Sequence, residues 1–245
     1  MYLYLIRHGQ STNNLLYETT GVDTEREFDP LLTEKGCRQA DALATYLQRQ
    51  AESAGAEALI ADEEPAALQM RLTHLYTSLM QRTILTALPT ARALGLPLTG
   101  WKDLHEGGGL YLHNPETDEN EGKPGPDRAW MAQTFPELGW PPDLDDGPWW
   151  NRPFEERAER MPRARRVLDE LLVRHGGSDD RVAFFTHAAF SNYFLSTLVG
   201  LEQDRSQVWF SMYNCAITGI KFVPDEAALI FLNRLHHLPD ELVTR

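Results

Sequence analysis

The sequence predicts an α/β fold of three layers, with a largely parallel central sheet, helices on both faces and an inserted lid. Short apolar runs rich in strand-forming residues alternate along the chain with longer segments of helical periodicity. Two of these runs, residues 2–6 and 182–185, show no alternation of polar and apolar side chains. Such runs are typical of strands that are buried on both faces of a parallel sheet.

The expected elements follow from periodicity and from start and stop signals. Thr33 is a suitable N-cap for a helix whose apolar residues recur at helical spacing, and Gly95 and Pro97 stop a later one. We expect strands at 2–6, 74–77, near 98, 182–185, 216–223 and 228–232, and helices at about 33–53, 79–94, 154–174 and 189–199.

The length of 245 residues fits a single domain, 1–245, better than two. Residues 105–154 interrupt the alternation with three successive glycines (107–109), several prolines and little periodicity. Five of the six tryptophans lie between 101 and 150, and a disordered tether would not be so aromatic. We therefore expect a folded, lid-like insertion, with the glycines as a candidate hinge.

The formal net charge of −13 argues against partners that are themselves polyanions. A basic surface is what neutralises the phosphates of nucleic acids or anionic lipid heads, so we expect no nucleic-acid or membrane partner. A small phosphorylated substrate remains compatible with this charge if a few arginines gather in one pocket. The sequence leaves open whether the chain forms a homo-oligomer.

Only two cysteines are present, too few for a disulfide framework and without the spacing of a zinc site. The chain has no apolar run of transmembrane length, and Met1 leads directly into the first apolar run without the pattern of a secretory signal. These features predict a cytoplasmic protein.

Two of the predicted buried strands end in histidine. Arg7-His8 follows the first strand, and Thr186-His187 follows residues 182–185. Because ligands of open α/β sheets bind beyond the carboxyl ends of the strands, we expect both histidines at one edge. Arginine forks suit the oxygens of a phosphoryl group, which needs several cationic or hydrogen-bonding neighbours.

With these residues in view, the sequence resembles the histidine phosphatase superfamily, in its phosphoglycerate-mutase-like branch. Five separate motifs in the family's order carry the resemblance and together cover most of the chain outside the insertion. They are Arg7-His8-Gly9-Gln10-Ser11 with Asn14; Pro30-Leu31-Leu32-Thr33 with Gly36, Gln39 and Ala40; Ser78 with Arg82 and Thr86-Ala87; Leu104-His105-Glu106; and Thr186-His187.

The resemblance implies a role for each matched residue. His8 would be the nucleophile and form a phosphohistidine, and flanking arginines would keep its attacking nitrogen unprotonated. Glu106 would protonate the leaving oxygen and then deprotonate the water that hydrolyses the intermediate. The scheme implies no cofactor and no metal. The residues expected to hold the phosphoryl oxygens are Arg7, Arg82, Asn14 and His187, and Gln10 and Ser11 would line or support the site.

Other interpretations stay open for single residues. Either histidine alone could be a buried, hydrogen-bonded core residue, and Arg82 an exposed helix charge. Glu106 is less certain than these because other acids lie nearby. His105, His113 and Asp118 could also be metal ligands, but their spacing matches no known type of site.

Departures from the family pattern favour hydrolysis. Glycines 107–109 follow Glu106, where cofactor-dependent mutases have an Arg-His-Tyr-Gly-like segment, and Ala188-Ala189 replaces the glycine that many members have after the second histidine. The sequence also lacks the longer Arg-His-Gly-x-Arg-x-Pro signature and the His-Asp pair of the acid-phosphatase and phytase branch. We expect a phosphomonoesterase of small metabolites; the alternatives are a bisphosphoglycerate-dependent phosphoglycerate mutase and a non-catalytic phosphate-binding protein.

Overall fold

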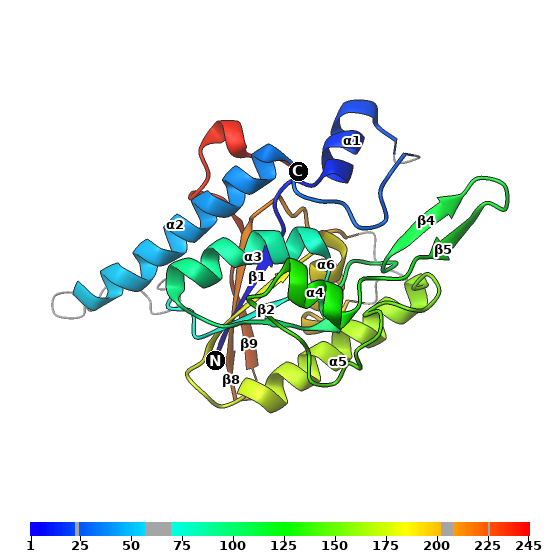
Figure 1. Cartoon of the computed structure of the whole chain (residues 1–245). Coiled ribbons are helices and arrows are strands. Elements are labelled where there is room, and N and C mark those ends of the chain that lie inside the picture. The colour runs from blue at the N-terminus through cyan, green and yellow to red at the C-terminus, as the bar shows by residue number, and fades with distance from the viewer. Residues whose placement is uncertain (23–24, 57–69, 202–207, 225) are drawn as a thin grey trace.

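The computed structural model describes the chain except for residues 23–24, 57–69, 202–207 and 225. Within the described residues, the centre is a seven-stranded sheet in the order β6-β3-β2-β7-β1-β8-β9 (Figure 1). The first five strands in this order, from β6 to β1, run parallel to one another. Strand β8 pairs antiparallel with β1, and β9 pairs antiparallel with β8. The bounds are β1 (Tyr2–Arg7), β2 (His74–Thr77), β3 (Leu98–Gly100), β6 (Leu138–Gly139), β7 (Arg181–Thr186), β8 (Ile217–Val223) and β9 (Glu226–Arg234).

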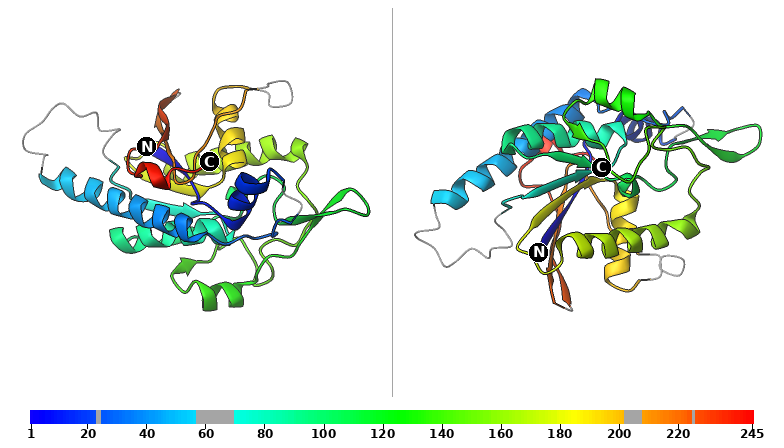
Figure 2. Two further views of the ribbon diagram at one scale, coloured as in Figure 1. Left: turned by 90° about the horizontal axis from the view of Figure 1, so that it is seen from above. Right: turned by 60° about the horizontal axis from the view of Figure 1, so that its bottom comes forward.

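Helices cover both faces of the sheet, which confirms the three-layer prediction. The helices α2 (Glu34–Ala56) and α3 (Gln81–Leu94) lie on one face, and α5 (Arg157–His175) and α6 (Ala188–Leu198) lie on the other (Figure 2). Each face has its own buried apolar cluster, because side chains of β1 and β7 point alternately to the two sides. No helix in the described part of the chain is long and apolar enough to cross a membrane.

The structure adds a helix where the sequence suggested only a turn. Helix α1 (Thr12–Thr20) begins directly after the His8 loop, with Ser11 as its N-cap. The Ser11 side chain accepts from the backbone N–H of Asn14, and the Asn14 side chain accepts from the backbone N–H of Ser11. This reciprocal capping box starts a helix in a segment without an apolar stripe.

Three predicted helices have other boundaries in the structure. Helix α3 starts at Gln81, two residues later than predicted, and α5 starts at Arg157, where Glu156 and Glu159 form a capping box. Helix α2 continues to Ala56, three residues beyond its predicted end. The predicted cap Thr33 is confirmed, since its hydroxyl accepts from the N–H of Gly36 at 3.0 Å.

The segment 105–154 is folded. It follows the short 3₁₀ helix η2 (Lys102–Leu104) and contains the hairpin of β4 (Tyr111–Asn114) and β5 (Glu119–Gly122), which projects from the body in Figure 1. It also contains α4 (Arg128–Thr134) and the strand β6, which pairs with β3. Its last part therefore extends the central sheet. Near the C-terminus, a further 3₁₀ helix, η3, spans Asp240–Leu242.

The loop after β1 is pressed against the first turn of α2. A Cβ at Gly9 would lie 2.6 Å from the carbonyl oxygen of Gly36, and a Cβ at Gly36 would lie 2.1 Å from that of Gln10. Real Cβ atoms do not approach backbone oxygens this closely, so both positions require glycine for space. This contact fixes the loop that carries His8.

We predict that Gly36→Ala destabilises the protein by about 1–3 kcal/mol, because the new methyl group must push the backbone of Gln10 away from α2. The better helix propensity of alanine offsets at most about 1 kcal/mol of this cost. Urea unfolding measures the change. The same variant should also displace His8, because the shifted backbone lies two residues from it.

Gly147→Ala is the matched control. Its Cβ would meet only the flexible Asp145 side chain, at 3.2 Å, so we expect a change within about 0.5 kcal/mol. Equal stability of the two variants would show that the contact between Gln10 and α2 is not tight in solution.

Candidate active site

The two predicted histidines lie side by side at one edge of the sheet. Strands β1 and β7 are parallel neighbours, and Arg7 pairs with Thr186 at the last position of the ladder. The next residues, His8 and His187, therefore leave the sheet together, and their ring centroids are 5.1 Å apart. The His8 backbone is tied on both sides, since its N–H donates to Thr186 and its carbonyl accepts from Asn214 Nδ2.

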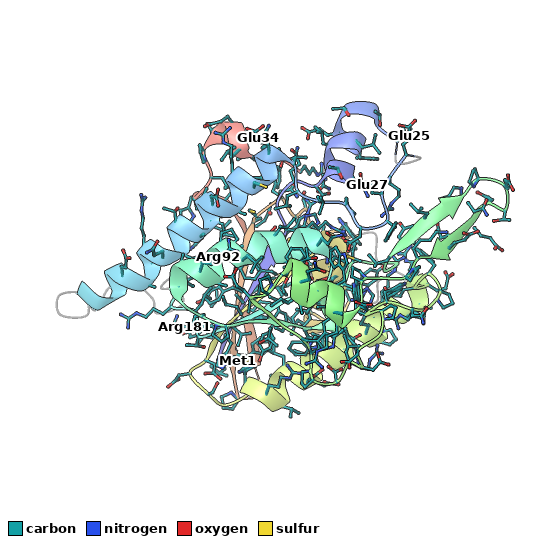
Figure 3. The ribbon with its side chains drawn as sticks, in the orientation of Figure 1. Met1, Glu25, Glu27, Glu34, Arg92 and Arg181 are labelled. Atoms are coloured by element: carbon teal, nitrogen blue, oxygen red, sulfur yellow. The ribbon has the colours of Figure 1, made fainter. Side chains whose placement is uncertain are left out.

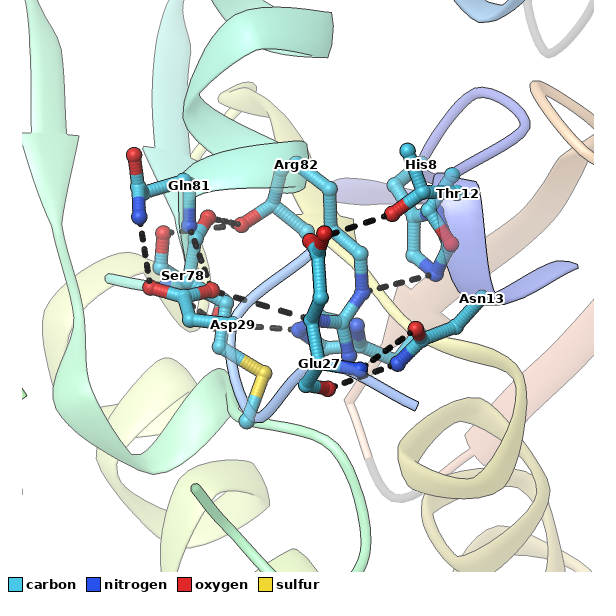
Figure 4. Close-up of polar contacts among 12 residues, drawn as sticks. His8, Thr12, Asn13, Glu27, Asp29, Ser78, Gln81 and Arg82 are labelled. Atoms are coloured by element: carbon cyan, nitrogen blue, oxygen red, sulfur yellow. Dashed lines mark hydrogen bonds and ion pairs between the residues drawn. The ribbon is translucent and has the colours of Figure 1, made fainter. Parts of the chain in front are cut away.

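Hydrogen bonds orient the His8 ring. Its Nδ1 lies 2.7 Å from the carbonyl oxygen of Gly9, which can only accept, so Nδ1 carries the proton. The other nitrogen, Nε2, then holds a lone pair and accepts from Arg82 Nε at 3.2 Å (Figure 4). The tautomer that these bonds select presents Nε2 as a nucleophile.

The surroundings also keep His8 neutral. Burial lowers its pKa well below the usual range, and the positive charges of Arg82 and Arg7 lower it further. The hydrogen bond to the Gly9 carbonyl opposes this shift. His8 is thus unprotonated at neutral pH.

Arg82 is held by an acid behind it. Asp29 Oδ1 lies 3.9 Å from Arg82 Nη1, and its carboxylate also accepts from the backbone and side-chain nitrogens of Gln81 (Figure 4). Burial lowers the Arg82 pKa, while the charge of Asp29 raises it. An arginine remains charged under such shifts, so this site retains a fixed cation beside Nε2.

Arg7 reaches the same pocket from the end of β1. Its Nη1 donates to the Met212 carbonyl at 2.5 Å, and its buried Nε has no hydrogen-bond partner among the described residues. Burial lowers the Arg7 pKa to about 10, and Glu106 opposes the shift, so the guanidinium stays charged at neutral pH. An unpaired buried donor is costly unless a ligand completes it, and a phosphoryl oxygen would do so.

His187 is a buried neutral histidine. Its Nε2 lies 3.0 Å from Ser78 Oγ, which also accepts from the Met80 N–H. Its Nδ1 has no partner in the described part of the chain. Burial lowers the His187 pKa, followed by the charge of Arg82. In the tautomer that carries its proton on Nδ1, neutral His187 can donate one hydrogen bond from this nitrogen.

Asn14, Ser11 and Gln10 occupy different places. The Asn14 side-chain oxygen accepts from Ser11 and from Asn214, so its amide nitrogen points away from both and is available as a donor. Asn14 and Ser11 line the pocket. Gln10 does not, because its side chain bonds to Thr33 and to Glu18, where it supports the loop.

Glu106 comes two residues after the end of η2 and lines the same pocket as His8. Its Oε1 accepts from the Gly107 N–H at 2.9 Å and from the Phe190 N–H at 3.2 Å, while the residue stays partly exposed to the pocket. The neighbouring His105 is buried instead and packs against Trp150. Burial, followed by the charge of Arg163, lowers the His105 pKa. His105 is thus a structural residue beside the pocket.

The pocket at His8 has a volume of about 240 Å³ and holds residues that sequence reasoning missed. Arg26 Nη1 donates to the Tyr111 hydroxyl at 2.6 Å, and Tyr111 belongs to the β4–β5 hairpin. Asn13 exchanges two hydrogen bonds with the Glu27 backbone, which anchors this loop on α1 (Figure 4). No motif marks these residues in the sequence. The lining residues are Arg7, His8, Ser11, Asn13, Asn14, Tyr17, Arg26, Pro30, Arg82, Glu106, Gly107 and Tyr111.

A histidine and aspartate cluster lies elsewhere. In the described part of the chain, His74, His175 and Asp180 are the group with side chains close enough to share a metal ion. His175 already pairs with Asp180 and with the Tyr76 hydroxyl, at 2.9 and 3.0 Å. Asp180 precedes Arg181, which Figure 3 places at the opposite end of the molecule from Glu27. The cluster is therefore separate from the pocket.

We predict that the protein loses stability as the pH falls below about 6.5. The folded pKa values of His8, His105 and His187 are depressed, so the unfolded chain binds more protons in this range, and the free energy of unfolding decreases. Each histidine contributes up to about 1.4 kcal/mol per pH unit. The raised pKa of Asp29, caused by burial, acts in the opposite direction.

Urea unfolding at pH 7.5 and 5.5 measures this loss. His105→Gln removes one of these groups, so the dependence on pH should weaken by about one proton. The pKa values of His236 and His237 are lowered too and act in the same direction, so an equal free energy of unfolding at both pH values would contradict the assignment of neutral histidines.

Solved structures with the same fold include three at low sequence identity. A mycobacterial glucosyl-3-phosphoglycerate phosphatase is 19% identical, with a TM-score of 0.58 and coverage of 95% of this chain and 98% of that one. An Entamoeba histolytica phosphoserine phosphatase is 18% identical, with a TM-score of 0.59 and coverage of 97% and 99%. Bacillus stearothermophilus YhfR is 19% identical, with a TM-score of 0.57 and coverage of 96% and 98%.

Sequence comparison gives the family directly. None of the curated proteins matches the chain. The family model described as the histidine phosphatase superfamily (branch 1) matches residues 3–56 and 53–234, which include both histidines and both arginines of the pocket. The resemblance drawn from the motifs is confirmed, and the chain belongs to branch 1 of the histidine phosphatase superfamily.

Proposed function

We propose that this phosphatase hydrolyses a small phosphomonoester through a phosphohistidine on His8, without a metal ion. One observation carries the proposal above the others. His8 Nε2 is unprotonated and lies 3.2 Å from Arg82 Nε, while Nδ1 is fixed on the Gly9 carbonyl. A nucleophile and a cation that can hold the attacked phosphoryl group are thus already in contact.

The first half-reaction forms the intermediate. The phosphoryl oxygens bind to the guanidinium groups of Arg7 and Arg82, with the Asn14 amide and His187 Nδ1 as further donors. His8 Nε2 attacks phosphorus, and the bond from phosphorus to the leaving oxygen breaks. Glu106, in its protonated form, gives its proton to that oxygen, so the alcohol leaves neutral.

The second half-reaction restores the enzyme. A water molecule takes the place of the alcohol and attacks phosphorus, Glu106 accepts its proton, and the bond between phosphorus and Nε2 breaks. Inorganic phosphate leaves, and His8 and Glu106 return to their starting states. The arginines supply fixed positive charge in a buried site, which stabilises the phosphoryl oxygens in both steps.

The pocket favours a small substrate. Its volume of about 240 Å³ accommodates a phosphoryl group and a short polar remainder. We infer that residues 105–154 form a lid that selects this remainder, because Tyr111 of the hairpin contacts Arg26 at the pocket. The phosphatases with the same fold are named for a phosphoglycerate derivative and for phosphoserine, which supports a phosphorylated metabolite of this kind.

We also infer that the protein works in the cytoplasm. Both Cys37 and Cys215 are free thiols, and burial raises the pKa of Cys215, so it stays protonated. A reducing compartment suits such a chain.

Phosphate release from a panel of phosphomonoesters, measured in the presence of a chelator, tests the proposal. The panel contains phosphoserine, 3-phosphoglycerate, sugar phosphates and 4-nitrophenyl phosphate. We predict turnover by the wild type, a loss of at least about 10³-fold in kcat/KM for His8→Ala, and a loss of about 10²–10⁴-fold on alkyl phosphates for Glu106→Gln.

His236→Ala is the control, since this exposed histidine packs on Tyr46 outside the pocket and should leave activity unchanged. Full activity of His8→Ala would contradict the mechanism. Interconversion of 2- and 3-phosphoglycerate would instead identify a mutase, and tight phosphate binding without turnover would identify a binding protein.

A further inference from the structure

Arg163 is a fully buried arginine outside the pocket that the reaction scheme does not use. It lies on α5 and is 1% exposed, and its partner Glu155 is 2% exposed. The two form a bidentate pair, with Nε donating to Oε1 at 2.6 Å and Nη2 donating to Oε2 at 2.8 Å. Removing two charges from water costs several kcal/mol each, and apolar pairs of the same size often stabilise a fold better. Stabilisation of the fold by packing therefore does not by itself explain why this pair is buried.

Arg160 of α5 lies 4.0 Å from Glu155 Oε2 and donates to the Glu155 carbonyl at 3.4 Å, and the other bonds of the pair go to the loop that carries Glu106. Arg163 Nη1 donates to the carbonyl oxygens of Asp103 and His105, at 2.8 and 2.9 Å. Glu155 Oε2 accepts from the Gly108 N–H at 3.3 Å, and the Glu155 N–H donates to the Gly108 carbonyl at 3.0 Å. The backbone is thus held on both sides of Glu106.

Arg163 also contacts the group that binds the Glu106 carboxylate. Its guanidinium carbon lies 5.2 Å from the centroid of the Phe190 ring, and the Phe190 N–H donates to Glu106 Oε1 at 3.2 Å. The backbone and the side chain of Glu106 are therefore both located by neighbours of one guanidinium. A planar fork with five donors can make these contacts together, whereas an ammonium group cannot.

We propose that Arg163 and Glu155 are positioning residues for the proton transfer by Glu106. This inference rests on the proposed function, in which Glu106 protonates the leaving oxygen. An error of about 1 Å in the position of a reacting group lowers the rate about 10²-fold, so a loosened loop should slow proton transfer while the phosphate site stays intact.

The test compares two aryl phosphates of nearly the same size. 4-Nitrophenolate leaves readily without a proton, whereas phenolate is a poorer leaving group and gains more from an acid. The parameter is kcat/KM, which covers the steps up to formation of the phosphohistidine and so excludes the role of Glu106 in hydrolysing it. A purely structural defect would lower kcat/KM for both substrates equally.

Arg163→Lys keeps the charge but loses the fork. We expect kcat/KM to fall about 10-fold or more on phenyl phosphate and less than about 3-fold on 4-nitrophenyl phosphate. In Glu106→Gln the difference between the two substrates should be larger. With 4-nitrophenyl phosphate, both variants should also give a burst of nitrophenolate, because water attack on the phosphohistidine becomes slow.

Glu155→Gln is the second variant, used also if Arg163→Lys does not fold. It keeps an acceptor for Gly108 but loses the charged pair. We therefore expect kcat/KM to fall more on phenyl phosphate than on 4-nitrophenyl phosphate, by a smaller factor than in Arg163→Lys. Arg165→Lys, an exposed arginine on the same helix, is the matched control and should behave as wild type.

Equal slowing of both substrates by Arg163→Lys and Glu155→Gln, or no slowing, would overturn the positioning role. If Glu106→Gln is selective in the same assay, only this inference fails. If His8→Ala remains active or Glu106→Gln shows no selectivity, the proposed function fails first. The two failures are therefore distinguishable.

Discussion

The parallel pairing of β1 with β7 is the constraint on which the site depends. Both strands end at the same residue pair of their register, Arg7 and Thr186. The residues that follow, two histidines 179 positions apart in the sequence, therefore become neighbours. A shift of the register by one residue would turn the side chains of one strand to the opposite face and separate the rings. The apolar residues of both strands hold the register, because each strand is buried on both faces of the sheet.

Buried positive charge is the second level of organisation. The chain carries a formal net charge of −13, yet Arg7, Arg82 and Arg163 are all buried around one edge of the sheet. Arg82 is paired with Asp29 and Arg163 with Glu155, and Arg7 has a backbone acceptor. Burial first, and then the charge of Arg82, lower the pKa values of the neighbouring histidines and keep them neutral. The same charges offer a site for an anion.

The sequence was sufficient to predict which residues lie at the ends of the buried strands. Apolar runs fix the strands, and the residues that follow them, His8 and His187, must then lie at the edge. The capping box that starts α1 is also present in the sequence, at Ser11 and Asn14, but no apolar stripe follows it that would predict a helix. Arg26 and Tyr111 could not be found in this way, because they come from an irregular loop and a projecting hairpin whose contact depends on how the chain packs.

The strand β6 shows the same limit in the fold. It has only two residues, and Leu138 and Gly139 show no strand pattern; they pair with β3 because the chain passes beside an open edge. The pair of Glu155 and Arg163 was hidden for another reason. Charged residues in a helix or just before one are usually exposed, so nothing in the sequence says that these two are buried.

Two of the glycines after Glu106 occupy positions that require glycine. Gly108 and Gly109 have φ values of +92° and +76°, which favour glycine, and a Cβ on Gly109 would lie 2.0 Å from the Trp150 ring. The chain must turn sharply here to leave the catalytic edge and begin the insertion. Glu155 then binds Gly108 from the far end of that insertion, where the chain returns. The two ends of the insertion are therefore hydrogen-bonded to each other beside Glu106. The same contact links the β4–β5 hairpin, which reaches the pocket, to the backbone that holds Glu106.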